Sequence, residues 1–332
     1  MKAVLCRRWC TPEELRLEEI PSPALGPGQV RIAVRHAGVS FATSLVIAGK
    51  YQRKPPLPFV PGTEAAGIVT EVAPDVKRLA VGQRVIAVLD WGGQAEEVVI
   101  PAETVYPLPD DLDMSVAVHV PVSYGTAYAA LIWRARLQPG ETLLVHGATG
   151  GVGLAAVEIG RFLGANVIAT ASAPAKREIA LAHGAHHALD TASDWRDAVK
   201  SLTGGRGADV IFDPIGGEEF DRSLRSIAQD GRLLTVGYAS GRIPSVPANL
   251  LLVKQFAVVG VNFGIYVGWG LTDERRRYAP KLVPAMAELC RWWQAGKIRP
   301  TVSHRFRLAD FLSAFQAVQG RQSIGKAVLD ID

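Results

Sequence analysis

The stretch LLVHGATGGVGLAAVEIGRFLGANVIATAS, residues 143–172, decides the fold of this 332-residue chain. It opens with a short apolar run, passes through four closely spaced glycines, continues with apolar residues at helical spacing and ends in a β-branched run. A strand, a glycine-rich turn, a helix and a second strand in this order predict a βαβ unit with parallel strands.

The glycine-rich turn also predicts a ligand. Glycine is needed where a turn is tight, where the backbone approaches a diphosphate and where a helix packs closely on a strand. The N–H groups and the dipole at the start of the helix favour bound phosphate. A turn without ligand is the competing interpretation, but the strand before it and the helix and strand after it favour a dinucleotide. The predicted diphosphate-binding residues are Gly147, Ala148, Thr149, Gly150, Gly151, Val152 and Gly153.

The end of the second strand indicates which dinucleotide binds. An acidic residue at this place accepts hydrogen bonds from the adenine ribose of NADH. This chain has Ser172 there, followed by Lys176 and Arg177. One hydroxyl and two cations suit the 2′-phosphate of NADPH through charge-assisted hydrogen bonds; the alternative is that both cations are merely solvated at a helix start. The sequence therefore favours NADPH over NADH.

The rest of the chain divides into a β-rich part and an alternating part. Short β-branched runs between turn residues predict strands at 30–34, 66–72, 84–89 and 95–100. An apolar residue at every fourth position predicts a buried helix over 112–132, with Tyr124 and Tyr128 in the core. From residue 141 strands alternate with helices, including a helix expected at 220–228 and another at 278–295. We expect an α/β protein in which residues 1–122 and 265–332 form a β-rich catalytic domain and residues 123–264 a doubly wound parallel-sheet domain.

Composition excludes several classes of protein. The chain has 36 basic and 32 acidic residues and is 48% hydrophobic, as in ordinary globular proteins. The basic run Arg275–Arg277 is expected to be a solvated helix face, so we predict no nucleic-acid partner. Three cysteines in no paired pattern, an N-terminus without a signal-peptide core and no long uncharged apolar stretch predict a cytoplasmic protein that does not cross a membrane.

Five segments carry a family resemblance: VRHAGVSFATSLVIAGKY, PGTEAAGIVTEV, VGQRVIA, HGATGGVG and GRQSIGKAVLDI. With them the chain resembles the medium-chain dehydrogenase/reductase superfamily over nearly its whole length, and within it the zinc-independent NADPH:quinone oxidoreductase branch. The resemblance implies a GroES-like β-rich catalytic domain, a Rossmann cofactor domain, and a homodimer built through the cofactor domains.

The zinc-dependent relatives place their metal ligands where this chain has Ser40, Thr63 and Ser123. None of these is a normal zinc ligand, because zinc prefers thiolate, imidazole or carboxylate, and 91–112 contains no cysteine for a structural site. We therefore expect no metal. An alkoxide would lack the Lewis acid that stabilises it in those relatives, so acceptors that take hydride readily are favoured: quinones and α,β-unsaturated carbonyls.

The resemblance also implies residue roles. Ser40 and Thr43 stand where quinone reductases usually have Asn and Asp, and Tyr51 matches a tyrosine that lines the active site; its alternative is a loop aromatic packed on proline. Thr126 is expected near the nicotinamide. Arg321 matches an arginine that reaches the cofactor phosphate in some relatives, or is solvated. The expected nicotinamide-holding loops contain Val236, Gly237, Tyr238 and Phe263.

Three functions remain in competition. The first is hydride transfer from NADPH to a quinone. The second is NADPH-dependent reduction of the C=C bond of an enoyl thioester or an alkenal. A thioester with a phosphopantetheine arm would need cations at the cleft mouth, for which Arg53, Lys54 and Arg275–Arg277 are the candidates. The third is a cofactor-binding protein with little turnover.

Overall fold

The computed structural model describes residues 1–332 and divides them into two compact units. Unit 1 comprises Met1–Val122, Gly264–Ala295 and Pro300–Asp332, and unit 2 comprises Ser123–Phe263 and Gly296–Arg299. The sequence assigned 296–299 to the first domain. In the structure they lie with unit 2, because Ile298 is fully buried and the backbone N–H of Arg299 donates to Glu158 Oε2 at 2.8 Å.

Unit 1 is built on a seven-stranded sheet. Its strand order is β14-β15-β3-β4-β5-β7, with β6 paired to β3, and a separate hairpin joins β1 and β2. Only β14 and β15 run parallel to each other; the other neighbours are antiparallel. The strands are β1 (Lys2–Leu5), β2 (Arg16–Glu19), β3 (Gln29–Val39), β4 (Glu64–Val72), β5 (Arg84–Val88), β6 (Glu97–Pro101), β7 (Val105–Pro107), β14 (Val302–Arg307) and β15 (Lys326–Asp330).

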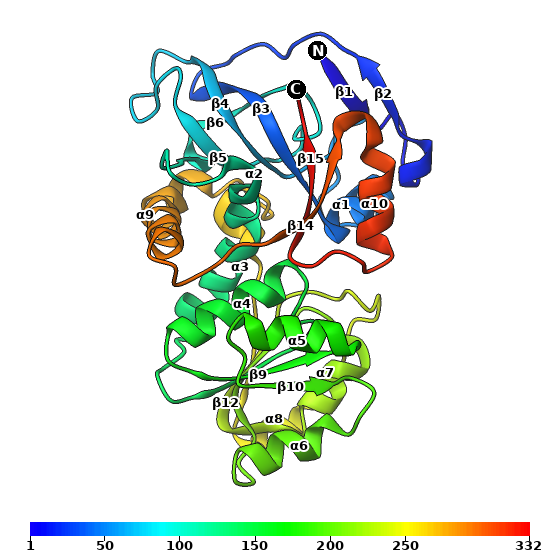
Figure 1. Cartoon of the computed structure of the whole chain (residues 1–332), viewed down its shortest axis with the longest axis vertical. Helices are drawn as coiled ribbons and strands as arrows, with labels where there is room; N and C mark the ends of the chain where they lie inside the picture. The colour runs from blue at the N-terminus through cyan, green and yellow to red at the C-terminus, as the bar shows by residue number, and fades with distance from the viewer. The chain divides into compact units, whose positions relative to one another are not determined.

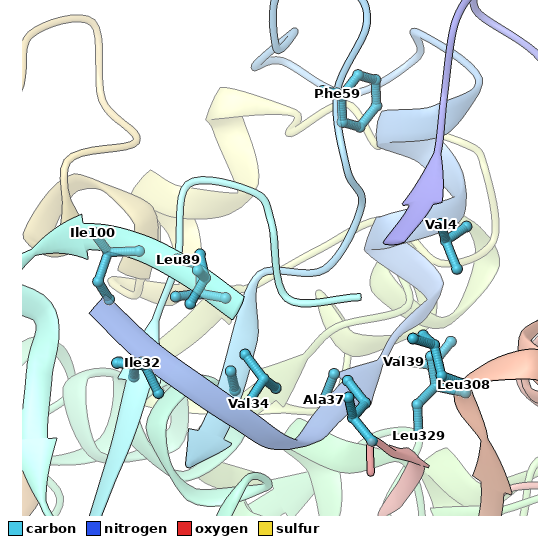
Figure 2. Packing of buried hydrophobic residues seen from close by; sticks show 14 of the residues in the cluster. Val4, Ile32, Val34, Ala37, Val39, Phe59, Leu89, Ile100, Leu308 and Leu329 are labelled. Atoms are coloured by element: carbon cyan, nitrogen blue, oxygen red, sulfur yellow. The ribbon is translucent and has the colours of Figure 1, made fainter. Parts of the chain in front are cut away.

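Strand β3 shows how the sequence specifies this sheet. Val30, Ile32 and Val34 alternate with less buried residues and point to the interior. The pairing of β3 with β4 contains two register shifts, and a Cβ on Gly67 would lie 2.1 Å from the carbonyl oxygen of Ala33. Gly67 is therefore required by close backbone approach. The apolar core beneath collects side chains from distant segments (Figure 2), among them Val4, Ile32, Val34, Val39, Phe59, Leu89, Ile100, Leu308 and Leu329.

The helices of unit 1 begin at recognisable caps. Ser40 precedes the first helix and its Oγ accepts the N–H of Thr43 at 3.3 Å, while Asp113 Oδ1 accepts the N–H of Ser115 at 2.9 Å at the start of the second. The helices are α1 (Phe41–Ile47), α2 (Met114–Ala117), α9 (Arg275–Gln294) and α10 (Phe311–Gln319), with single 3₁₀ turns at Pro12–Glu14, Ala102–Thr104, Phe263–Val267 and Leu308–Asp310.

Unit 2 is a doubly wound parallel sheet of six strands in the order β10-β9-β8-β11-β12-β13. Helices α4 and α5 lie on one side of this sheet and α6, α7 and α8 on the other (Figure 1). The direction of winding reverses between β8 and β11, the position where such sheets bind ligands at their carboxyl ends. The strands are β8 (Thr142–Val145), β9 (Asn166–Ala171), β10 (His187–Asp190), β11 (Ala208–Asp213), β12 (Ile227–Thr235) and β13 (Ala257–Gly260). The helices are α3 (Gly125–Tyr128), α4 (Gly151–Phe162), α5 (Pro174–Ala182), α6 (Trp195–Leu202), α7 (Gly217–Ser223) and α8 (Ala248–Lys254).

In unit 2 one predicted helix ends earlier than expected and one helix was missed. The helix expected at 220–228 ends at Ser223, because the chain turns there and Ile227 already pairs with Ala208 as the first residue of β12. Helix α8 was not predicted at all. It is only seven residues long and leaves Leu252 and Val253 exposed, so it lacks the one-sided apolar pattern by which helices are detected.

The long apolar helix predicted over 112–132 is helical over Met114–Arg134, but two stretches, Val120–Tyr124 and Ala129–Arg134, are wound as π-helix. By length and composition this run could cross a membrane, yet 83% of its most apolar window is buried within the protein. Core helices pass the same test. Tyr124 and Tyr128 are 0% and 8% exposed, which confirms their assignment to the core.

Candidate functional site

The glycine-rich turn joins β8 to α4 and has the geometry that a diphosphate requires. Gly147 has φ of +58°, and a Cβ on Gly153 would lie 2.2 Å from the carbonyl oxygen of Gly147. Any larger residue at 153 would therefore push the helix off the turn. A Cβ on Gly150 would meet only that same oxygen, at 3.5 Å, so the backbone at Gly150 is open to a ligand. Within the turn Ala148 and Thr149 are buried, and no side chain caps α4, which begins with Gly151 and Val152.

Two further loops meet this turn at the carboxyl ends of β11 and β12. Asp213, the last residue of β11, accepts the N–H groups of Ile215 and Gly216 at 2.8 and 2.9 Å. These two hydrogen bonds hold the turn after β11 so that Ile215 contacts Gly147. A Cβ on Gly147 would lie 3.0 Å from Ile215 Cδ1. Burial raises the pKa of Asp213, whose second carboxyl oxygen has no hydrogen-bond partner. Asp213 was not predicted; the signal that could have revealed it is the strand-ending DPIGG, in which both glycines have positive φ.

The predicted residues Val236, Gly237 and Tyr238 lie in the loop that follows β12. The N–H of Val236 donates to the carbonyl of Asp213 at 2.9 Å, which places this loop beside the Asp213 turn. The ring of Tyr238 packs over Gly216, where a Cβ would lie 3.0 Å from Tyr238 Cδ1, and remains 41% exposed. Three strand ends thus bring the glycine-rich turn, the Asp213 turn and this loop together.

The residues predicted to select NADPH lie at the end of β9. Ser172 is exposed, and Lys176 and Arg177 are half-buried in the first turn of α5. Arg177 Nη1 forms an ion pair with Asp190 Oδ2 at 2.9 Å and also donates to the carbonyls of Ala171 and Ser172. The guanidinium is therefore held against the strand end where the ribose is expected, but it shares its charge with Asp190.

Two other predicted cofactor contacts in unit 2 are buried. Thr126 is 7% exposed on α3, which packs against α4, and Phe263 is 5% exposed at the boundary of the unit. Their contact with a nicotinamide stays a prediction.

In unit 1 the structure brings Ser40 and Thr43 together. Their hydroxyl oxygens lie 3.0 Å apart in a hydrogen bond at the start of α1, with Ser40 half-buried and Thr43 3% exposed. Phe41, between them, is 42% exposed. The two hydroxyls form one uncharged polar group.

Tyr51 lies in the loop after α1 and makes no hydrogen bond to Ser40 or Thr43. Burial raises the pKa of its phenol, so the group is protonated at neutral pH and can donate a hydrogen bond. Two residues further on, Arg53 Nη1 forms an ion pair with Asp90 Oδ1 at 2.5 Å and its guanidinium lies over the ring of Trp91. These contacts fasten the loop that carries Tyr51 to the end of β5.

The basic run of α9 differs from its prediction as a solvated face. Arg275 is only 5% exposed and binds both carboxylate oxygens of Asp90 at 2.9 Å. Arg276 and Arg277 are exposed, but each forms an ion pair with a carboxylate, at 3.0 and 2.8 Å. Together with Arg53, all these arginines are neutralised by carboxylates of their own unit.

Glu64 and Lys326 form a buried ion pair in unit 1 that the sequence did not reveal. Their side chains are 1% and 5% exposed, and Glu64 fills the space beside Gly38, where a Cβ would lie 2.5 Å from Glu64 Cγ. The pair joins the first residue of β4 to the first residue of β15. Glu64 follows Thr63 directly, so the pair anchors the PGTEAAG segment that carries the family resemblance.

The positions where relatives bind zinc are occupied by Ser40, Thr63 and Ser123. No group of three or more His, Cys, Asp or Glu side chains lies close enough to hold a metal ion. Arg321, the remaining predicted residue, is exposed in unit 1 with φ of +56°, just after α10. Both the absence of zinc and the role of Arg321 stay predictions.

His146 has a structural role. It is fully buried in the residue after β8, where its two ring nitrogens pair with Thr170 Oγ1 at 2.9 Å and Ser223 Oγ at 2.8 Å. Burial lowers its pKa to about 3, so the ring stays neutral beneath the glycine-rich turn.

Comparison with known proteins identifies the family. Residues 26–110 match the family model described as an alcohol dehydrogenase GroES-like domain, and residues 151–278 match the one described as a zinc-binding dehydrogenase. The quinone oxidoreductase-like protein 2 of Rattus norvegicus is 37% identical over 332 residues, covering 99% of this chain and 92% of the relative. The chain belongs to the medium-chain dehydrogenase/reductase superfamily. Its quinone oxidoreductase branch, with the GroES-like and Rossmann domains, is confirmed.

Solved structures of this superfamily agree with the fold throughout. A mycobacterial protein complexed with NADPH has a TM-score of 0.91 at 31% identity and covers 99% of this chain and 100% of that one. The Escherichia coli quinone oxidoreductase complexed with NADPH has a TM-score of 0.89 at 26% identity, with the same coverage.

Proposed function

We propose that this medium-chain reductase transfers hydride from NADPH to a quinone. The observation that carries the proposal is the glycine-rich turn at the switch point of the sheet, where Gly153 packs on Gly147 and cations lie at the end of the neighbouring strand. A relative named as quinone oxidoreductase-like supports the acceptor, and two structural neighbours of this chain that are complexed with NADPH support the cofactor.

Each part of the chain has a separate task in this reaction. The backbone N–H groups at the start of α4 bind the diphosphate, and Ser172, Lys176 and Arg177 bind the 2′-phosphate. When bound, NADPH supplies the hydride, and the quinone takes up that hydride and one proton to become the hydroquinone. Ser40, Thr43 and Tyr51 are weak acids, and burial raises the pKa of Tyr51 further, so they orient the acceptor oxygen by hydrogen bonds while the proton comes from solvent.

Reduction of an enoyl thioester is less well supported by the charges of unit 1. Of the candidate cations for a phosphopantetheine arm, Arg53 and Arg275–Arg277 are paired with carboxylates, whereas Lys54 is exposed and forms no ion pair. Binding such an arm would require breaking these pairs or relying on Lys54 alone. A quinone has no phosphate and makes no such demand.

The test is NADPH oxidation by EDTA-treated protein, assayed in parallel with an aromatic ortho-quinone and with an enoyl thioester. We expect turnover with the quinone. Turnover with the thioester alone would transfer the proposal to C=C reduction. Tight NADPH binding without turnover of either acceptor would overturn it in favour of a binding protein.

We also propose a homodimer joined through unit 2. Strand β13 is an edge of the sheet, and close to it in sequence Ile243, Leu252 and Val253 are 71%, 83% and 79% exposed. Unpaired edge strands and exposed aliphatic groups favour association. Light scattering should give twice the chain mass for the parent and the chain mass for Leu252→Glu/Val253→Glu. The control Val81→Glu, which changes an exposed valine of unit 1, should remain a dimer.

A cytoplasmic location is proposed as well. All three cysteines are free thiols, with Cys6 and Cys290 buried, as is usual where disulfides are kept reduced. Cell fractionation with an antibody would test it, and recovery in the membrane fraction would contradict both this location and the expected absence of a membrane-spanning segment.

A further inference from the structure

A polar pocket of about 320 Å³ lies in unit 2, away from the glycine-rich turn. Its residues include Gly207, directly before β11, Ile227 at the start of β12, and Lys254, which precedes β13. These three strands are parallel to β8. The pocket therefore lies at the amino ends of the strands, whereas the cofactor turn follows the carboxyl end of β8. The two sites are at opposite edges of one sheet.

The pocket is lined by four cations, Lys200, Arg206, Arg225 and Lys254, and by no carboxylate. Only Arg206 has an acidic partner, Asp209, at 3.4 Å. The other three form no ion pair, in contrast to Arg275–Arg277, each of which does. Three positive charges thus share one depression without a counter-ion from the chain.

Lys254 is the anchored member of this group. Its ammonium donates to the carbonyl oxygens of Leu224 at 3.2 Å and Ile227 at 3.0 Å. An ammonium has three N–H donors, so one remains for a ligand. Burial lowers the pKa of Lys254, and the positive charge of Lys200 lowers it further. An anion placed between these two lysines would remove their repulsion and satisfy the third donor.

We propose that this pocket binds a small phosphate-bearing anion with at least two negative charges. The volume suits a molecule of the size of pyrophosphate or a short phosphate ester. Cations from α6, from the loop before β11, from the turn after α7 and from α8 surround it, and Gln229 adds a neutral donor. The four cations are spread around one concave site, which favours a compact anion over an extended polyanion. The proposal does not depend on the reaction at the cofactor site.

The test uses inorganic pyrophosphate as the probe, titrated by calorimetry at constant ionic strength. The protein is first saturated with NADPH, so that the diphosphate site at α4 is already occupied. We expect one pyrophosphate to bind per chain. Lys200→Gln/Arg225→Gln should bind it about tenfold more weakly, because each charged hydrogen bond lost weakens an anion complex substantially. NADPH affinity should be unchanged.

The matched control is Arg35→Gln/Lys297→Gln, which removes the same charge from exposed cations outside the pocket. It should bind pyrophosphate like the parent. Equal weakening in both double variants would show only a response to net charge, and no binding by the parent would show an unfilled depression; either result overturns the proposal.

Discussion

Unit 2 and unit 1 carry out their proposed tasks by different means. In unit 2 the candidate site is backbone: glycines whose Cβ would collide, and N–H groups at a helix start. In unit 1 the candidate site is side chain: the hydroxyls of Ser40 and Thr43 and the phenol of Tyr51, on an ordinary capped helix and its loop. A backbone site tolerates almost no substitution, whereas a side-chain site can change its chemistry while the fold stays intact. The departure from the usual Asn and Asp occurs in unit 1, which fits this difference.

The comparison predicts its largest effect at Gly153. In Gly153→Ala the new methyl group would lie 2.2 Å from the carbonyl oxygen of Gly147, so α4 must move. We expect a loss of about 3 kcal/mol in the free energy of unfolding. NADPH binding should weaken about a hundredfold, because the N–H groups at the start of α4 would no longer point at the diphosphate. Urea unfolding and fluorescence titration measure both. Gly260→Ala, where a Cβ meets nothing within 4 Å, should change neither; normal NADPH binding by Gly153→Ala would refute the backbone interpretation.

The contribution of His146, beneath the glycine-rich turn, to the free energy of unfolding should depend on pH. The pKa of His146 is about 3 in the folded protein and 6.5 ordinarily, so the unfolded chain binds a proton there between these values and the folded protein does not. Stability attributable to His146 is therefore lost as pH falls below 6.5, by about 1.4 kcal/mol per pH unit. Urea unfolding between pH 6.5 and 4.5 should show the parent losing that much more per unit than His146→Gln. Parallel pH profiles would contradict the buried neutral ring.

Side chains make a smaller contribution to the cofactor site. We expect Lys176→Ala/Arg177→Ala to weaken NADPH binding about ten- to hundredfold and to leave NADH binding unchanged, since only NADPH carries the 2′-phosphate. Arg177→Ala alone should weaken NADPH binding less than the double variant does, because Asp190 already balances part of the charge of Arg177. Lys297→Ala/Arg35→Ala is the charge-matched control. An equal loss of affinity for NADPH and NADH would show that Lys176 and Arg177 do not bind the 2′-phosphate.

The smallest effect is expected in unit 1. Ser40→Ala and Thr43→Val each remove one uncharged hydrogen-bonding group, so kcat/KM for the quinone should fall about three- to tenfold while the KM for NADPH stays constant. Ser44→Ala, on the same helix, is the control and should behave like the parent. A loss of a hundredfold or more for Ser40→Ala would mean that the hydroxyl takes part in the chemistry.

These differences explain what could be predicted from the sequence. Glycine spacing around a βαβ unit has few physical causes, so the turn at Gly147–Gly153 and the parallel sheet were predictable. The alternation of Val30, Ile32 and Val34 fixed the face of β3 in the same local way. The pairing of Arg275 with Asp90 and of Glu64 with Lys326 joins residues far apart in the chain, and no local pattern marks either pair. Asp213 is intermediate between the local patterns and the long-range pairs. Its position at the end of a strand could be predicted from the sequence, but its role depends on Gly147 in another loop.

The Glu64–Lys326 pair has a consequence for biosynthesis. During translation Glu64 leaves the ribosome on the order of tens of seconds before Lys326 does. All of unit 2 and strand β14 are made in that interval. A carboxylate cannot enter an apolar interior without its partner cation, so the nascent first part must keep Glu64 in water or bind a proton there until the last strand arrives. The β-rich domain therefore closes only after its last strand has been made, and a chain released without residues 326–332 should fold its cofactor domain while its catalytic domain stays open.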